Sequence, residues 1–208
     1  PTPPPPILSG LVGSEMCIRD RYRTIPGMAV IHPADDLSAE ELTVQLLDYS
    51  NPSYMRTARN KTPRIYNEET VSDLQIGKGS KIRDGDDVCI VACGVMVNEA
   101  VSAAKKLSSE GISASVVDMH TIKPLDTELI DECVKQCGCL VTAEDHSIIG
   151  GLGGAIAEYL STNATAPLEM IGVADKFGQS GSTNDLMRAM KLTVDDIVAA
   201  VHKSISRK

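Results

Sequence analysis

The chain has no tryptophan and one phenylalanine, and aromatic residues make up 3% of its 208 residues. It also lacks any apolar run of the roughly 20 residues that a transmembrane helix needs, so we expect no membrane partner. Basic residues number 20 against 28 acidic ones, which gives a net charge of -8. This charge disfavours nucleic acid and anionic surfaces as main partners. With 42% hydrophobic and 23% charged residues, the chain is ordinary globular material for one or two domains.

Metal-binding patterns are also absent among the six cysteines. Cys89 and Cys93 lie in or beside an apolar segment, where buried thiols behave as small hydrophobic groups. Cys133, Cys137 and Cys139 are closer together, but their spacing matches no familiar zinc or iron–sulfur pattern, and no histidine lies nearby to complete one. We therefore expect no metal ligands in this chain. A chain of this size does not need disulfides, which favours a reducing compartment, the cytoplasm.

The N-terminal segment differs from the rest of the chain. Five of its first six residues are proline, which excludes helix and central strand there. Residues 13–22 resemble translated sequencing-adapter read-through. The segment also lacks the basic start of a signal peptide. We expect residues 1–22 to be foreign to the protein or disordered, and we leave them out of the fold prediction.

From Arg23 onward, the sequence predicts alternating strands and helices. Strands are expected at residues 28–32, 53–56, 88–92, 114–119, 140–143 and 168–173. Helices are expected from Ser38, which has Glu41 at the capping-box spacing, over residues 97–107, 129–137 and 152–160, and from Thr193. Residues 63–85 show little periodicity and predict an interdomain connector with a hairpin around residues 77–79. Strands buried on both faces and alternating with helices predict an α/β fold with a mainly parallel sheet.

Polar residues and glycines follow the predicted strand at 140–143. Ligands of open parallel sheets gather beyond the carboxyl ends of the strands. Glu144, Asp145 and His146 are therefore candidates for an acid–base cluster. No nucleophile accompanies them, which favours a hydrogen-bonded loop at a subunit interface instead. Gly150, Gly151 and Gly153 would let a phosphate approach the amides of the following helix, or let helix and sheet pack closely; we favour packing.

A basic cluster follows the predicted strand at 53–56. It contains Arg56, Arg59, Lys61 and Arg64. Guanidinium groups bind phosphate through two parallel hydrogen bonds, so the cluster suits a phosphorylated substrate. A solvated basic loop that pairs with nearby glutamates explains the same residues equally well.

Four stretches together resemble the C-terminal half of transketolase, particularly the split, two-subunit form of bacteria and archaea. They are residues 25–30 with the following Pro33-Ala34-Asp35, residues 56–59, residues 144–154 and residues 177–181. The resemblance covers nearly all of residues 23–208. It implies the end of a pyrimidine-binding domain at 23–67, a linker at 68–85, and a helix-covered, mainly parallel transketolase C-terminal domain at 86–208.

The same resemblance implies a transferase of the pentose phosphate pathway that moves a two-carbon ketol unit between sugar phosphates, using thiamine diphosphate and Mg²⁺. Arg59 falls where family members hold the substrate phosphate. The family's cofactor-activating glutamate and its cofactor-stacking aromatic residue precede the part that matches here, so we expect no catalytic residue in this N-terminally truncated chain. We expect it to be inactive without the missing half and a diphosphate-binding N-terminal subunit, with homodimerisation giving a heterotetramer.

Alternatives remain open. Deoxyxylulose-phosphate synthase and the beta subunit of 2-oxo acid dehydrogenases belong to the same superfamily. They usually have glycine where His146 stands, and the synthase has Pro-Arg-Gly where residues 58–60 stand, which favours transketolase by analogy. A non-catalytic dimerisation or regulatory domain and a small nucleotide-binding protein are the other two hypotheses.

Overall fold

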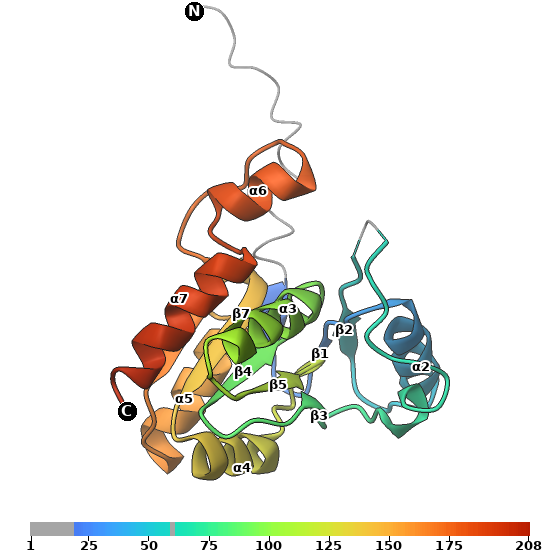
Figure 1. Ribbon diagram of the computed structural model, residues 1–208. Helices are drawn as coiled ribbons and strands as arrows, with labels where there is room; N and C mark the ends of the chain where they lie inside the picture. The colour runs from blue at the N-terminus through green and yellow to red at the C-terminus, as the bar shows by residue number, and fades with distance from the viewer. Residues whose placement is uncertain (1–18, 59–60) are drawn as a thin grey trace, which may run out of the picture.

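The computed structural model describes residues 19–58 and 61–208. Two β-sheets form its framework, with helices around them (Figure 1). The smaller sheet has the order β2-β1-β6, in which β1 (Ala29–Ile31) pairs in parallel with β2 (Ser53–Met55) and antiparallel with β6 (Thr121–Lys123). Since β6 lies far along the chain, between two elements of the larger sheet, the N-terminal and C-terminal parts of the fold share this smaller sheet.

The larger sheet has the order β3-β5-β4-β7-β8. Its strands are β3 (Ser80–Arg83), β4 (Val88–Ala92), β5 (Ala114–Asp118), β7 (Leu140–Ser147) and β8 (Leu168–Val173). All pairs are parallel except β3 with β5. Every residue of β4 and β5 is buried, as expected for strands covered on both faces. The predicted α/β fold with a mainly parallel, helix-covered sheet is confirmed.

Helices cover both faces of the larger sheet (Figure 1). On one face lie α3 (Met96–Ser109) and α7 (Val194–Ile205), and on the other α4 (Thr127–Cys137) and α5 (Leu152–Asn163). Alternate residues of β4 enter the two cores: Ile90 packs with the first pair of helices and Val91 with the second. The sequence pattern predicts all four of these helices. It misses α6 (Thr183–Ala189), which has no buried residue.

The start of α2 (Asp36–Leu47) differs from the prediction. The N-cap is Asp35, not Ser38: its side chain accepts a hydrogen bond from Ser38 N at 2.8 Å, and Ser38 Oγ accepts one from Asp35 N at 3.0 Å. Aspartate caps helices as well as serine does, and a serine three residues later completes the reciprocal pair. The predicted pairing of Ser38 with Glu41 at the helix start is therefore wrong.

Two further expectations about secondary structure differ from the structure. The connector expected at 63–85, with a hairpin around residues 77–79, contains the short helix η1 (Val71–Asp73) and then β3, which pairs with β5 instead of forming a hairpin. The last residues of that segment therefore belong to the larger sheet. In addition, β7 runs on to Ser147, so Glu144, Asp145 and His146 lie in the strand and not in a loop after it.

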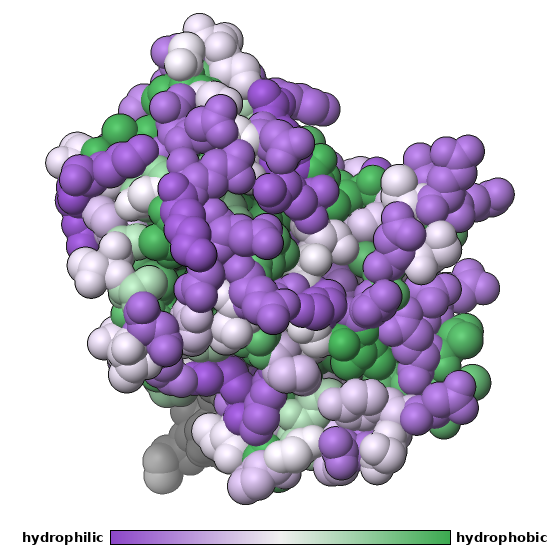
Figure 2. Space-filling view, turned by 90° about the horizontal axis from the view of Figure 1, so that it is seen from below, coloured by the Kyte–Doolittle hydropathy of each residue, from purple (hydrophilic) through white to green (hydrophobic). Residues whose placement is uncertain are grey.

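Part of the N-terminal segment is also described. Residues 19–23 form a helical turn, and the Arg19 side chain is buried against Glu144. Residues 1–18 lie outside the described residues, and the expectation that residues 1–22 are foreign to the protein stays a prediction. Figure 2 shows mainly polar residues on the face seen from below, with apolar patches among them. No helix in the described part of the chain is both long and apolar enough to cross a membrane.

Candidate functional site between the two sheets

The carboxyl ends of strands from both sheets meet in one region. His32 follows β1, Arg56 follows β2, Gly94 lies just after β4, and Asp145 lies near the end of β7. In the larger sheet, β4 has β5 on one side and β7 on the other, which makes its end the topological switch point where open parallel sheets bind ligands. Here the imidazole of His32 fills that point: a Cβ atom on Gly94, whose φ is +58°, would overlap the ring.

An ion pair joins the two sheets at this point. Arg56 Nη1 donates to Asp145 Oδ1 at 2.9 Å and to Asp145 Oδ2 at 2.8 Å. His32 Nε2 lies 3.0 Å from the same nitrogen and 3.8 Å from Asp145 Oδ1. Burial alone would raise the pKa of Asp145, but the charge and hydrogen bonds of the Arg56 guanidinium oppose it, and the pKa lies below its usual range. Asp145 is therefore ionised, and Arg56 is its counterion.

His32 is neutral at physiological pH. Its side chain is fully buried, and burial lowers its pKa to about 3. Its Nδ1 faces Arg19 Nη1 at 3.2 Å, while its Nε2 faces Arg56. A neutral imidazole accepts at one ring nitrogen only, so one of these two guanidinium contacts is not a hydrogen bond. Since Arg19 belongs to the segment that we expect to be foreign, Arg56 is the partner that we assign to the protein.

The same cluster contains the one group of described residues with the spacing of a metal site. His146 packs edge-on against His32, with ring centres 5.6 Å apart, and burial lowers the pKa of His146 to about 2. Ligand atoms of His32, Asp145 and His146 lie within 4.8 Å of one another. Mg²⁺ prefers an octahedral set of oxygen ligands. Two imidazoles and a carboxylate already paired with Arg56 therefore do not suit that ion.

Glu144 serves a different purpose from its two neighbours. Its carboxylate accepts hydrogen bonds from Leu152 N at 2.8 Å and Gly153 N at 2.9 Å, at the start of α5. Helix N-termini are ready-made anion sites, and here the protein's own carboxylate occupies the site. The structure therefore leaves no room for a phosphate on these amides. Phosphate binding was one of the two interpretations of the glycines in the sequence.

The glycines of this stretch allow close packing. A Cβ atom on Gly151 would overlap the Glu144 carboxylate, and one on Gly153 would lie 2.8 Å from Thr142 Oγ1 and from Met170 Sδ. Gly150 has a φ of +82°, which side chains rarely adopt. These contacts agree with the favoured packing interpretation. The possible interface with another subunit stays a prediction.

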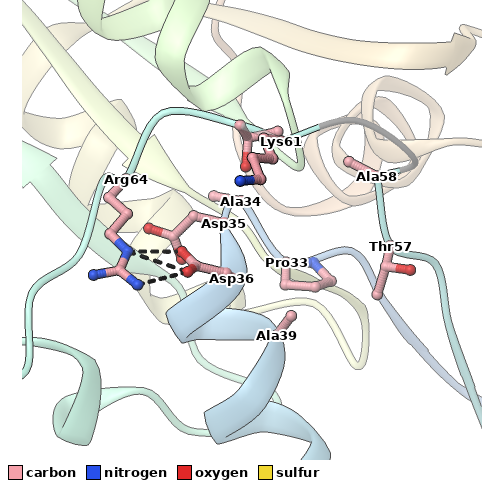
Figure 3. Close-up of a pocket in the computed structure, with 10 residues that line it drawn as sticks. Pro33, Ala34, Asp35, Asp36, Ala39, Thr57, Ala58, Lys61 and Arg64 are labelled. Atoms are coloured by element: carbon pink, nitrogen blue, oxygen red, sulfur yellow. Dashed lines mark hydrogen bonds and ion pairs between the residues drawn. The ribbon is translucent and has the colours of Figure 1, made fainter.

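Two cavities flank the segment that follows β2. One, of about 420 Å³, lies at the end of β1 beside the start of α2 (Figure 3). The other, of about 410 Å³, lies between this segment and the larger sheet, and Asn98, Gln179 and Met187 are among its lining residues. Both have the size of small-molecule pockets. Ala58, Lys61 and Thr62 line both cavities, so these three residues lie at the wall between them.

Two members of the predicted basic cluster, Arg56 and Arg64, form ion pairs, and each of them lines one of the two cavities together with Lys61. Arg59 lies outside the described residues. Arg56 forms an ion pair with Asp145. Arg64 donates two hydrogen bonds to Asp36, from Nε to Oδ1 at 3.0 Å and from Nη2 to Oδ2 at 2.7 Å (Figure 3). Lys61 is exposed and makes no ion pair with any described residue. Lys61 is therefore a cation available to an anion in either cavity.

Two carboxylates whose roles the sequence does not predict support this region. Asp35 Oδ2 accepts hydrogen bonds from Ile65 N at 2.7 Å and Tyr66 N at 2.9 Å, so the N-cap of α2 also holds the chain beyond Lys61. Tyr66 Oη donates to the buried Asp118 Oδ2 at 2.7 Å. Burial raises the pKa of Asp118 to about 7. A signal for Asp118 was present: an acidic residue at the end of a strand that is buried throughout.

Comparisons with known proteins agree with this architecture. A family model described as the transketolase C-terminal domain matches residues 77–197. The 6-deoxy-6-sulfo-D-fructose transketolase subunit SqwH of Clostridium sp. (strain MSTE9) is 41% identical over 94% of this chain and 61% of its own length. The putative transketolase C-terminal section of Methanocaldococcus jannaschii is 40% identical over 89% of this chain and 58% of its own.

A solved structure gives the same result. A split gene transketolase, in an inactive beta4 tetramer, superposes with a TM-score of 0.88 at 39% identity, over 92% of this chain and 62% of that one. The chain thus spans about three fifths of the length of the proteins it matches. The family model covers more than half of the chain, and sequence and fold agree with it: the chain belongs to the transketolase C-terminal domain family.

Proposed function

We propose that this chain is the C-terminal part of a transketolase, which transfers a two-carbon ketol unit between sugar phosphates. The observation that carries the proposal is the cavity at the ends of β1 and β2 in a chain of this family: its wall carries Lys61, which forms no ion pair with a described residue. A cation at such a pocket suits the phosphate of a sugar phosphate. Arg59, which lies outside the described residues, is our candidate for a bidentate phosphate ligand because it falls where family members hold the substrate phosphate.

The proposal assigns thiamine diphosphate and Mg²⁺ mainly to residues other than those described here. Two imidazoles and an arginine-bound carboxylate do not suit Mg²⁺, and the structure gives no second candidate among the described residues. We therefore expect the isolated chain to bind the cofactor weakly and to be inactive. A diphosphate-binding N-terminal transketolase subunit would complete the enzyme in the cytoplasm, and homodimerisation of this chain would make the assembly a heterotetramer.

The test is a kinetic assay of the complete enzyme, with its partner subunit, thiamine diphosphate and Mg²⁺. Arg59→Ala should raise the KM for a sugar phosphate, because a charge-assisted hydrogen bond contributes about 1.5–3 kcal/mol. Lys105→Ala is the control, since Lys105 is exposed on α3, away from both cavities. An unchanged KM in Arg59→Ala would contradict the phosphate assignment. Tight binding of thiamine diphosphate to the isolated chain, measured by titration calorimetry, would contradict the assignment of the cofactor to other residues.

Two alternative functions give different results in the same assay. A 2-oxo acid accepted as donor in place of a ketose phosphate would favour a deoxyxylulose-phosphate synthase or a 2-oxo acid dehydrogenase beta subunit. An assembled but inactive complex would favour a non-catalytic dimerisation or regulatory domain. His146 supports transketolase, because those two relatives usually have glycine at a position that here carries a ring packed against His32.

A further inference from the structure

The stretch that carries Lys61 is held at both ends. At its far end, Asp35 binds the backbone of Ile65 and Tyr66, and Asp36 pairs with Arg64. At its near end, Arg56 follows β2 and donates its backbone N–H to Ile31 O at 2.9 Å. The guanidinium of Arg56 then extends to Asp145, a residue 89 positions along the chain in the other sheet. The far end is thus bound only to residues of the N-terminal part. The near end is bound both to the N-terminal part, through Ile31, and to the larger sheet, through Asp145.

The surroundings of the Arg56–Asp145 pair make its geometry well defined. The side chains are 24% and 16% exposed, so water competes weakly for either partner. One guanidinium nitrogen contacts both carboxylate oxygens and His32 Nε2. Charge-assisted hydrogen bonds between partly buried groups are short and directional. If Arg56 rotated away, the Asp145 carboxylate would lose its counterion and would face mainly the neutral imidazole of His32, with little water to replace the guanidinium. Such rotation is therefore unfavourable.

We propose that Asp145 is a positioning residue: by holding Arg56, it fixes how the chain leaves β2 and so places Lys61 at the wall between the two cavities to meet an anionic substrate group. The inference rests on the proposed function for the identity of that group, a sugar phosphate. It gives the C-terminal domain a part in substrate binding without a ligand of its own, because His32 and Arg56 of the N-terminal part contact Gly94 and Asp145 at the switch point of the larger sheet.

The kinetic test separates positioning from a general structural role. In the complete enzyme, Asp145→Asn should raise the KM for a phosphorylated acceptor about tenfold, the loss of roughly one charge-assisted hydrogen bond. The kcat, and the KM for an unphosphorylated acceptor aldehyde, should stay within about twofold. Asp145→Glu should recover most of the loss. Asp195→Asn is the matched control: it removes an aspartate that also pairs with a cation, Lys106 at 2.6 Å, on the exposed surface of the C-terminal domain.

A double-mutant cycle tests whether Asp145 acts through Arg56. If it does, the double variant Arg56→Gln with Asp145→Asn should have the same KM for the phosphorylated acceptor as Arg56→Gln alone. The second change then removes a residue that has already lost its partner. Fully additive losses would overturn the inference. Equal losses with phosphorylated and unphosphorylated acceptors would also overturn it, because damage to the fold affects both substrates alike.

A second measurement needs no enzymatic activity and uses the purified full chain. Amide hydrogen exchange of the peptide spanning residues 57–64 should be faster in Asp145→Asn than in the wild type and unchanged in Asp195→Asn. Unchanged exchange in Asp145→Asn would overturn the positioning role. If the complete wild-type enzyme transfers no ketol unit, the proposed function fails, and the exchange experiment still decides whether Asp145 positions this stretch.

Discussion

Two regions near the carboxyl ends of strands are candidate binding sites by sequence, and the structure shows that they differ. The glycine run after β7 is conspicuous in the sequence, yet it is closed. Glu144 fills the anion site of α5, and Gly151 and Gly153 let the strand and helix approach. The basic stretch after β2 is less conspicuous, yet it is open: its described residues line two cavities, and Lys61 forms no ion pair with the described part of the chain. A conspicuous motif therefore marks packing here, and a plain one marks the candidate binding site.

The closed region should respond most strongly to the volume of a side chain. Gly151→Ala places a Cβ atom on the Glu144 carboxylate, and we expect the free energy of unfolding to fall by about 3 kcal/mol through overpacking and strained amide–carboxylate bonds. Gly154→Ala is the control in the same run. Its Cβ atom would be no closer than 3.6 Å to any neighbour, and helical alanine gains about 0.5–1 kcal/mol over glycine. Denaturant unfolding of the two variants measures both effects, and equal stabilities would show that the run is not closely packed.

The buried support of the open region should make stability depend on pH. The pKa of Asp118 is raised by burial from 3.8 to about 7, although the hydrogen bond from Tyr66 lowers it and the charge of Asp35 raises it further. The folded state therefore holds a proton that the unfolded state loses. The stabilisation is complete below pH 3.8 and is lost as the pH rises towards 7.

Asp118→Asn removes this titration. Relative to the variant, the wild type should lose about 2–3 kcal/mol of unfolding free energy between about pH 5 and pH 8, since one pKa unit corresponds to about 1.4 kcal/mol. Comparison with the variant cancels the buried histidines: burial lowers the pKa of His120 to about 4, for example, which acts in the opposite direction. Denaturant unfolding at several pH values measures the difference. Parallel curves for the two proteins would show that Asp118 titrates normally.

Local patterns predicted most of the fold. The apolar strands of the larger sheet and the capping box of α7 at Thr193 depend on neighbouring residues, and the structure has them. The missed elements depend on distant partners. β3 has polar residues and pairs only as an edge strand, and the short β6 pairs with β1, far away in the sequence. Such pairings leave no periodicity in the strand's own residues.

The candidate site was predictable only in part, for the same reason. The position of polar residues after strands pointed to Asp145 and to the basic cluster. The pairing of Arg56 with Asp145 could not be predicted, because it joins two sheets. Nor could the insertion of His32 over Gly94, which requires the register between two separate strands. The sequence therefore showed which residues were polar, and the structure showed which of them already have partners.

Substitution of Lys61 should have the smallest effect of the three, and it distinguishes the two regions most directly because it should change substrate binding and not stability. Lys61→Gln keeps most of the side-chain stem and removes the charge, so the KM for a phosphorylated acceptor should rise several-fold, up to about tenfold, with stability unchanged. The loss should shrink as ionic strength increases, because an exposed charge is screened by salt. Lys78→Gln is the control, because Lys78 is an exposed lysine already paired with Glu128 at 2.8 Å. Equal behaviour of the two variants at low salt would mean that the open region does not bind the phosphate through Lys61, and that an unpaired cation beside a cavity is not enough to identify the binding site in this fold.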